Sequence, residues 1–253
     1  MRTIDKKYYN CFTGYSFCNI VWSMKIAVII PAYNEGKAIS DVIAKVPKNI
    51  SGVGPVRIYV VDDGSADNTG DVALKAGAHV VRHAINLGVG AATITGIQAS
   101  LRDGANILVT LDGDGQHDPT EIETLVTPVV NENIDFVVGS RFLKKPSKQT
   151  PKIRIVGNRI MNILTFIFYR VWLSDTQSGY KAFSAKAANR MHLSFSGYEI
   201  CSEMIGEIRR LQLQYTEVPV KIIYSQYSIK KGQSALNGVN ILLKMITRFI
   251  LGR

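Results

Sequence analysis

Short apolar runs alternate with helical patterns along most of the chain. From Met24 onward, "IAVII" (26–30) predicts a buried strand, and apolar residues at every third or fourth position over 39–46 predict an amphipathic helix. Further strands are expected at 57–65, 78–83, 106–114 and 135–141, with helices near 67–76, 88–101 and 120–131. This alternation predicts an α/β fold in which a mostly parallel central sheet is flanked by helices on both faces.

Polar residues collect where the expected strands end. They are Pro31, Tyr33, Asn34 and Glu35, then Asp62 and Asp63, then Asp112 and Asp114, and finally Ser140 and Arg141. A surface turn would explain any one of these groups, because Asp, Asn and Gly form turns readily. Their repetition at one edge of a parallel sheet predicts a functional site at the carboxyl ends of the strands.

The segment "LDGDGQHDP" (111–119) carries the most specific chemistry. A strand that runs into Asp-Gly-Asp places Asp112 and Asp114 on the same side of the chain, where both can bind one divalent cation, with the Gln116 carbonyl as a further oxygen ligand. The expected ion is Mg²⁺ or Mn²⁺, which would neutralise a departing diphosphate. Asp118, directly before Pro119, is expected to cap the next helix instead.

Charge is divided unevenly between the two halves of the chain. Residues 1–140 contain 11 Lys and Arg against 15 Asp and Glu, a net −4, whereas residues 141–253 contain 19 against 5, a net +14. A basic second half fits a phosphate-bearing partner such as an anionic lipid, a lipid phosphate or a nucleic acid, and an ordinary basic surface is the alternative. Because spaced aromatic platforms and RNP-type strands are missing, a nucleic-acid partner is not expected.

Three segments are expected: an N-terminal extension (1–23), one α/β domain (24–235) and a C-terminal amphipathic helix (236–253). The extension lacks the continuous apolar region of a signal peptide. In the C-terminal helix the apolar residues share one face, which fits either a membrane interface or a protein core. Cysteines at 11, 18 and 201 do not suggest a disulfide framework and favour a reducing compartment.

Two other enzyme classes share single features with this sequence. The segment "GVGAAT" (88–93) is similar to a dinucleotide-binding loop, but that fingerprint follows the first strand directly, and here it lies several elements downstream. A nucleotidyltransferase would also use acidic metal ligands on an α/β domain, but its glycine-rich, lysine-bearing N-terminal loop is missing. Both alternatives are disfavoured on the position of the glycines.

Six motifs in order, "VIIPAYNE", "VVDDGSADNT", "NLGVGAA", "LDGDGQHDP", "VVGSR" and "DTQSGYKAF", resemble the polyprenyl-phosphate glycosyltransferases of glycosyltransferase family two. Dolichol-phosphate mannosyltransferase and dolichyl-phosphate glucosyltransferase are members of that group. The resemblance covers about residues 25–234 and implies a GT-A fold, a nucleotide diphosphate sugar donor and a polyprenyl phosphate acceptor. It also implies a peripheral position on the cytoplasmic face of the membrane. GDP-mannose, UDP-glucose and UDP-N-acetylglucosamine remain open, and the form "DTQSG" leans toward UDP-sugars.

The resemblance also implies roles for individual residues. The nucleotide sugar would be bound by Pro31, Ala32, Tyr33, Glu35, Asp62, Asp63, Asp112, Gly113 and Lys231. The metal would be bound by Asp112, Asp114 and Gln116, the acceptor phosphate by Arg141, Arg154 and Asn158, and the sugar by Gln177 and Ser178. Asp114, Arg141 and Arg154 would be catalytic. Two positions depart from the family pattern: Asn158 replaces a Ser, and Lys231 stands where an Arg is usual.

The expected mechanism follows from the acceptor. A lipid phosphate is already anionic at neutral pH, so it can attack the anomeric carbon without a base, and one in-line displacement would invert that centre. His117 is adjacent to the site but is not expected to act as a base. If the acceptor were instead a sugar hydroxyl, Glu199 or Glu203 would be the candidate base. The simpler interpretation of Glu199, Glu203 and Glu207 is a solvated or ion-paired helix face.

Overall fold

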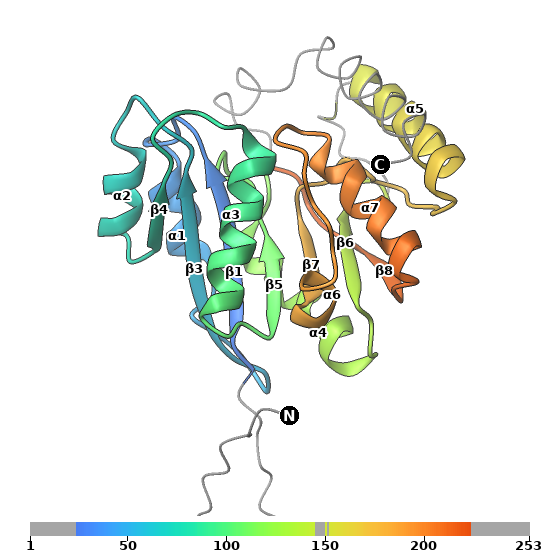
Figure 1. The fold of residues 1–253 in the computed structure, drawn as a ribbon, viewed down its shortest axis with the longest axis horizontal. Coiled ribbons are helices and arrows are strands. Elements are labelled where there is room, and N and C mark those ends of the chain that lie inside the picture. Colours follow the sequence, from blue (N-terminus) through green and yellow to red (C-terminus); the bar gives the residue numbers. More distant parts are fainter. Residues whose placement is uncertain (1–23, 145–149, 151, 224–253) are drawn as a thin grey trace, which may run out of the picture.

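The computed structural model describes residues 24–144, 150 and 152–223. The predicted N-terminal extension (1–23), the predicted C-terminal helix (236–253) and Lys231 lie outside the described residues. Figure 1 shows a single twisted sheet with helices on both of its faces. The predicted α/β architecture is therefore confirmed.

Seven strands follow one another across the sheet in the order β4-β3-β1-β5-β7-β6-β8, and β2 pairs with β3. The strands are β1 (Ile26–Ala32), β2 (Asn49–Ile50), β3 (Gly54–Asp62), β4 (His79–Arg82), β5 (Ile107–Thr110), β6 (Phe136–Ser140), β7 (Lys181–Ser184) and β8 (Tyr215–Pro219). Within the seven-strand order, β7 is antiparallel to β5 and β6, and the other pairs are parallel. The sheet is thus mostly parallel, as predicted, with one reversed strand near its middle.

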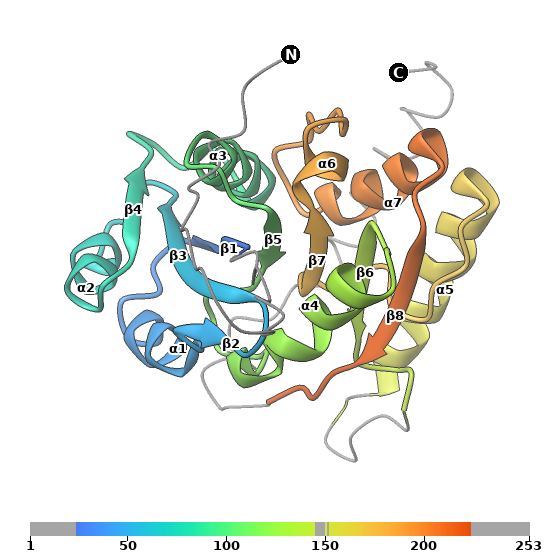
Figure 2. The same ribbon diagram turned by 90° about the horizontal axis from the view of Figure 1, so that it is seen from below.

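Helices cover both faces of the sheet. They are α1 (Ile39–Lys45), α2 (Thr69–Lys75), α3 (Val89–Arg102), α4 (Ile122–Asn131), α5 (Lys152–Tyr169), α6 (Ala185–Ala188) and α7 (Ile200–Leu211), with a short 3₁₀ turn, η1 (Pro119–Glu121), before α4. Figure 2 shows α3, α6 and α7 on one face and α1 and α4 on the other. Asp118 caps η1, accepting a hydrogen bond from Thr120 N, as predicted.

The continuous apolar run of β1 follows from this layering. Val28 and Ile30 pack into the core on the side of α1 and α4, while Ala27 and Ile29 pack into the core on the side of α3 and α7. Because both faces of a central parallel strand are covered, neither set of alternate residues can be polar. The strands expected at the other four stretches are also present, whereas β7 and β8 were not predicted.

The three glutamates expected on a solvated or ion-paired helix face are all buried, and Glu207 is ion-paired with Arg210. The helix begins at Ile200, later than the expected segment, and the chain before it folds back over the glutamates. Glu203 accepts hydrogen bonds from Ser194 N and Phe195 N, and Glu207 accepts one from His192 N. The alternative of a solvated face was wrong, because Glu203 and Glu207 serve as acceptors for the backbone N–H groups of 192–195, whereas the ion-paired alternative holds for Glu207.

Candidate functional site

The polar residues after β1, β3, β5 and β6 meet at one edge of the sheet, because parallel strands end on the same side (Figure 1). The segment 175–180 joins them from the other direction, since the reversed strand β7 starts at this edge. The site therefore combines the ends of four strands with the beginning of a fifth.

Asp112 and Asp114 follow β5 and are held by different groups. The Asp114 carboxylate accepts a hydrogen bond from Gln116 N at 2.9 Å and another from the Gln116 side-chain amide. Asp112 Oδ2 lies 3.4 Å from His117 Nδ1, and the Asp112 side chain is 43 % exposed. Partial burial, and then the neighbouring Asp112 carboxylate, raise the pKa of Asp114. Two adjacent carboxylates of this kind are stabilised by a shared cation.

The carboxylate pair fits a hard divalent ion. Within the described ranges no cluster of three or more His, Cys, Asp or Glu side chains has metal-binding geometry. The two aspartates are the residues that would hold such an ion. The Gln116 main-chain carbonyl accepts a hydrogen bond from Ile223 N at 2.8 Å, so its expected metal contact stays a prediction.

His117 lies beneath this pair and is 1 % exposed. Its ring packs against Tyr180 with ring centroids 5.1 Å apart. Burial, followed by the positive charge of Arg141, lowers the pKa of His117 to about 4, so the imidazole is neutral at pH 7. A ring closed off from solvent in this way cannot meet an incoming acceptor, which agrees with the expectation that His117 is not the base.

The loop after β1 is fastened to the loop after β3. Asn34 N donates to Ser65 Oγ at 3.0 Å, and Glu35 N donates to Thr69 Oγ1 at 2.8 Å. Of the residues expected to bind the nucleotide, Ala32 and Glu35 are buried and Tyr33 is exposed. Gly113 packs against this loop, because a Cβ on Gly113 would lie 3.3 Å from Pro31 O. The first loop and the Asp-Gly-Asp segment thus form one surface.

The two adjacent aspartates at the end of β3 face different surroundings. Asp63 accepts hydrogen bonds from Leu87 N at 2.9 Å, from Gly88 N at 2.8 Å and from His83 Nδ1, 2.7 Å away. Both of its oxygens therefore hold the segment 83–88 in place. The expected contact of Asp63 with the nucleotide stays a prediction.

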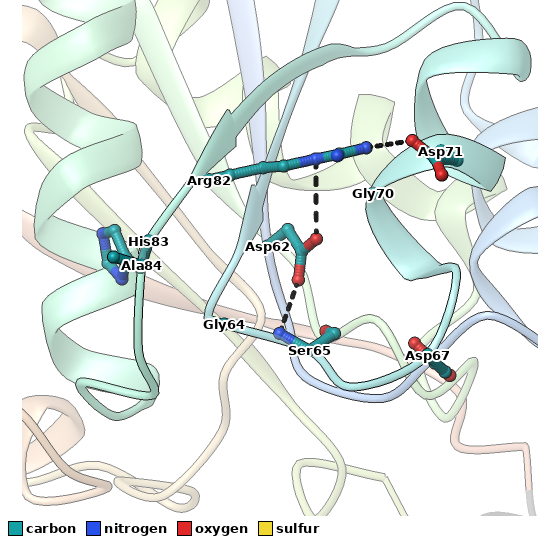
Figure 3. A pocket seen from close by; sticks show the side chains of 9 residues that line it. All are labelled: Asp62, Gly64, Ser65, Asp67, Gly70, Asp71, Arg82, His83 and Ala84. Carbon is teal, nitrogen blue, oxygen red and sulfur yellow. Dashed lines mark hydrogen bonds and ion pairs between the residues drawn. The ribbon is translucent and has the colours of Figure 1, made fainter.

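Asp62 instead borders a polar pocket of about 180 Å³ at the carboxyl ends of β3 and β4 (Figure 3). Its lining residues are Asp62, Gly64, Ser65, Asp67, Gly70, Asp71, Arg82, His83 and Ala84. Asp62 accepts a hydrogen bond from Ser65 N at 3.1 Å and lies 3.8 Å from Arg82 Nε, and Arg82 also pairs with Asp71. Polar side chains from the first half of the chain therefore line a pocket beside the site.

The glycines of "GVGAAT" allow a close approach of two backbones. Ser196 O accepts hydrogen bonds from Gly90 N at 2.6 Å and Ala91 N at 3.2 Å, so it closes the N-terminus of α3. A Cβ on Gly90 would lie 2.2 Å from Phe195 O. The helix end that a dinucleotide-binding domain offers to phosphate is occupied here by the protein's own carbonyl. This geometry confirms that the segment is not a dinucleotide loop.

Arg141, after β6, is held by a buried carboxylate that the sequence analysis did not single out. Its Nε lies 2.6 Å from Asp175 Oδ2, its Nη2 lies 2.7 Å from Asp175 Oδ1, and its backbone N also donates to Oδ2 at 3.0 Å. Asp175 is fully buried. Such a bidentate ion pair fixes the plane of the guanidinium. The only sequence signal for Asp175 was its place in the motif "DTQSGYKAF".

Of the other residues expected to bind the acceptor or the sugar, Asn158 and Gln177 form hydrogen bonds within the protein. The Asn158 amide donates to Ser174 O at 2.9 Å, and the Gln177 amide donates to Ser202 Oγ at 3.1 Å. Ser178 is fully buried. Arg154 belongs to the first turn of α5, and its side chain lies outside the described part of the structure. The ligand contacts of these residues stay predictions.

Comparison with known proteins gives the family. Residues 27–191 match the family model described as glycosyl transferase family 2. The chain is 39 % identical over 229 residues to an uncharacterized protein of Methanocaldococcus jannaschii, covering 89 % of this chain and 93 % of that protein. It is 35 % identical over 242 residues to the UDP-N-acetylglucosamine–dolichyl-phosphate N-acetylglucosaminyltransferase of Methanococcus voltae, covering 87 % and 94 % respectively.

The fold is similar to that of glucosyl-3-phosphoglycerate synthase from Mycobacterium tuberculosis, which was solved with Mn²⁺ and UDP-glucose. The TM-score is 0.63 at 22 % identity, covering 88 % of this chain and 79 % of that one. The expected GT-A architecture is thereby confirmed. Because the family model matches more than half of the chain and the Methanococcus voltae relative covers 87 % of it, the chain belongs to glycosyltransferase family 2 and is an enzyme of the transferase class.

Proposed function

We propose that this chain transfers a sugar from a nucleotide diphosphate to the phosphate of a polyprenyl lipid. The observation that carries the proposal is the meeting of two phosphate-binding features at one sheet edge. The carboxylate pair Asp112 and Asp114 is suited to a metal-bound diphosphate, and Arg141 is suited to a second phosphate. The similarity to the Methanococcus voltae enzyme supports a polyprenyl acceptor and makes UDP-N-acetylglucosamine the first donor to test.

The chemistry needs positioning more than proton transfer. An oxygen of the lipid phosphate forms a bond to the anomeric carbon while the bond from that carbon to the diphosphate oxygen breaks, which inverts the centre. Asp112 and Asp114 would hold Mg²⁺ or Mn²⁺, and the bound ion supplies neutralisation of the charge on the departing diphosphate. Arg141, with its plane fixed by Asp175, orients the attacking phosphate.

A sugar hydroxyl acceptor would need a general base, and the candidate residues are buried. The Glu203 carboxylate accepts hydrogen bonds from the backbone of Ser194 and Phe195, and Glu199 is buried beside Gly197. His117 is buried as well. The phosphate acceptor, which needs no base, therefore fits the site better.

An apolar stripe on α5 supports a position at the membrane surface. Val156, Ile160, Ile163 and Ile167 recur at helical spacing, and each is between 51 % and 54 % exposed. Trp172 follows the helix and is also exposed. The cations Arg159 and Arg170 are exposed on the same segment. An amphipathic helix with flanking cations binds an anionic bilayer surface, which for this chain would be the cytoplasmic one.

The membrane contact expected from the sequence was the C-terminal segment 236–253, which lies outside the described residues. The exposed stripe of α5 is a second, independent candidate for the same role. Across the described residues no helix is both long enough and apolar enough to cross a bilayer.

The proposal is tested by incubating the protein with polyprenyl phosphate and labelled UDP-N-acetylglucosamine, UDP-glucose or GDP-mannose, with Mg²⁺ or Mn²⁺. Label from one donor should enter the lipid phase, and the unphosphorylated polyprenol and excess chelator should each prevent this. Arg141→Ala should raise the KM for lipid phosphate at least about tenfold and leave the KM for the donor nearly unchanged. Transfer to polyprenol, or to a soluble sugar with no lipid phosphate present, would contradict the proposal.

A further inference from the structure

Ser174 is a junction between three separate parts of the fold. Its N–H and its hydroxyl donate to Glu217 of β8, at 2.9 Å and 2.8 Å. Its Oγ also lies 2.6 Å from Ser140 Oγ at the end of β6. Its carbonyl accepts hydrogen bonds from the side-chain amides of Asn158 and Asn162 on α5, at 2.9 Å and 2.7 Å. The position of Ser174 is therefore fixed from every side.

Glu217 is the unusual member of this junction. In the part of the chain that the structure describes, its carboxylate forms no ion pair, and its partners are N–H and O–H donors. Burial raises the pKa of Glu217, and the hydrogen bonds from Ser174 oppose that rise. A half-buried carboxylate without a cation costs free energy unless it satisfies several donors. The contacts of the Glu217 carboxylate therefore indicate that it holds Ser174 in place.

The residues beside this junction belong to the proposed acceptor site. Asp175 directly follows Ser174 in the chain and clamps the guanidinium of Arg141. Ser140, which directly precedes Arg141, bonds to Ser174 as well. Glu217 thus bonds directly to Ser174, and it reaches Ser140 only through Ser174.

We propose that Glu217 is a positioning residue that acts through Ser174 and Asp175 to hold Arg141 in place for the acceptor phosphate. The inference rests on the proposed function, because it assigns Arg141 to that phosphate. Acceptor affinity would then also depend on a residue of β8 that acts on the Arg141 guanidinium only through Ser174 and Asp175.

The chain offers a matched control at Glu203. Its carboxylate accepts hydrogen bonds from Ser194 N at 3.0 Å, from Ser194 Oγ at 2.8 Å and from Phe195 N at 3.0 Å. These contacts repeat the chemistry of Glu217 with Ser174, and they lead to Ser194 and Phe195 instead of to Arg141. Glu203→Gln and Glu217→Gln therefore remove the same kind of contact, and only the second loosens the proposed clamp.

The experiment compares KM values for a short-chain polyprenyl phosphate and for the nucleotide sugar, together with the Tm of each variant. Glu217→Gln should raise the acceptor KM about fivefold and change the donor KM less than about twofold. Ser174→Ala, which removes only a hydroxyl, should change the acceptor KM in the same direction. Glu203→Gln should lower Tm to a similar extent while leaving both KM values near those of the wild type.

A double-mutant cycle with Arg141→Lys separates positioning from general stability. If Glu217 acts through Arg141, adding Glu217→Gln to Arg141→Lys should change the acceptor KM by less than about twofold. Full additivity, or an equal acceptor effect from Glu203→Gln, would overturn the inference and leave the proposed function intact. Absence of transfer to polyprenyl phosphate by the wild type would overturn the proposed function and, with it, the role given to Arg141.

Discussion

Gly179→Ala should damage the metal site by moving one carboxylate. A Cβ at this position would lie 2.4 Å from Asp112 Oδ1 and 2.8 Å from its Cγ. Because ordinary non-bonded contacts are about 3.5 Å, the methyl group and the carboxylate must separate by about 1 Å. The backbone of Gly179 has no positive φ, so alanine adds no conformational strain there.

The carboxylate is the side that should move. Thr110 Oγ1 donates to Gly179 O at 2.7 Å, and Tyr180 N donates to Ser178 Oγ at 3.2 Å, so the turn is held from both directions. The Asp112 side chain, at 43 % exposed, is free to swing toward solvent. A displacement of about 1 Å at a catalytic group can lower the rate about 100-fold, and a misplaced ligand should weaken metal affinity about 10-fold or more.

The assay is Mn²⁺ binding in the presence of UDP, followed by electron paramagnetic resonance, together with kcat/KM at saturating metal. Gly157→Ala is the matched control, because Gly157 is exposed on α5 and a Cβ there would meet nothing within 4 Å. The control should retain wild-type metal affinity. Wild-type Mn²⁺ affinity and kcat/KM in Gly179→Ala would refute the placement of Asp112 in the metal site.

Three further perturbations have defined outcomes. Asp114→Asn should lower Mn²⁺ affinity and turnover by orders of magnitude with little change in Tm, and unchanged turnover would exclude the aspartate as a ligand. Ile160→Ser combined with Ile163→Ser should reduce sedimentation with anionic vesicles while activity on a short soluble acceptor persists, and undiminished sedimentation would remove α5 from the membrane contact. Although Glu207 is buried, hydrogen bonds from Arg210 and the backbone lower its pKa, so its stabilising effect should be present at pH 7 and lost as the pH falls from the ordinary pKa of a glutamate through the lowered pKa of Glu207. The free energy of unfolding of Glu207→Gln and of the wild type, measured in denaturant at pH 7 and at strongly acidic pH, checks this. A difference between the two proteins that persisted at acidic pH would contradict it.

The features that sequence reasoning found are those with a local signal. The strand β1 was visible because both of its faces are covered, which leaves a continuous apolar run. Asp112 and Asp114 were visible because alternate residues of an extended chain share one side. Asp118 could be assigned to a cap because a proline follows it. Each of these predictions depends only on residues that are neighbours in the sequence.

What sequence reasoning missed depends on partners far away in the chain. Arg141 and Asp175 are 34 residues apart, and no periodicity relates them. Asp63 and Asn158 were expected to face ligands because they are polar and follow the motifs, but each bonds to backbone groups of another segment. A polar side chain satisfies whichever donor or acceptor the fold brings near it, and only the tertiary structure decides which one that is.

The reversed strand β7 has a consequence for how such enzymes diversify. Residues 141–180 leave the sheet at the end of β6 and return to it at the start of β7, and Gly139 N donates to Tyr180 O at 2.8 Å across that gap. The excursion, which contains α5, therefore begins and ends at the same point. Its length and sequence can change while the register of the strands on either side stays the same. Exchanging residues 142–173 between relatives should thus change the exposed surface of α5, while Gly179, which packs against Asp112, and the nucleotide half of the molecule stay undisturbed.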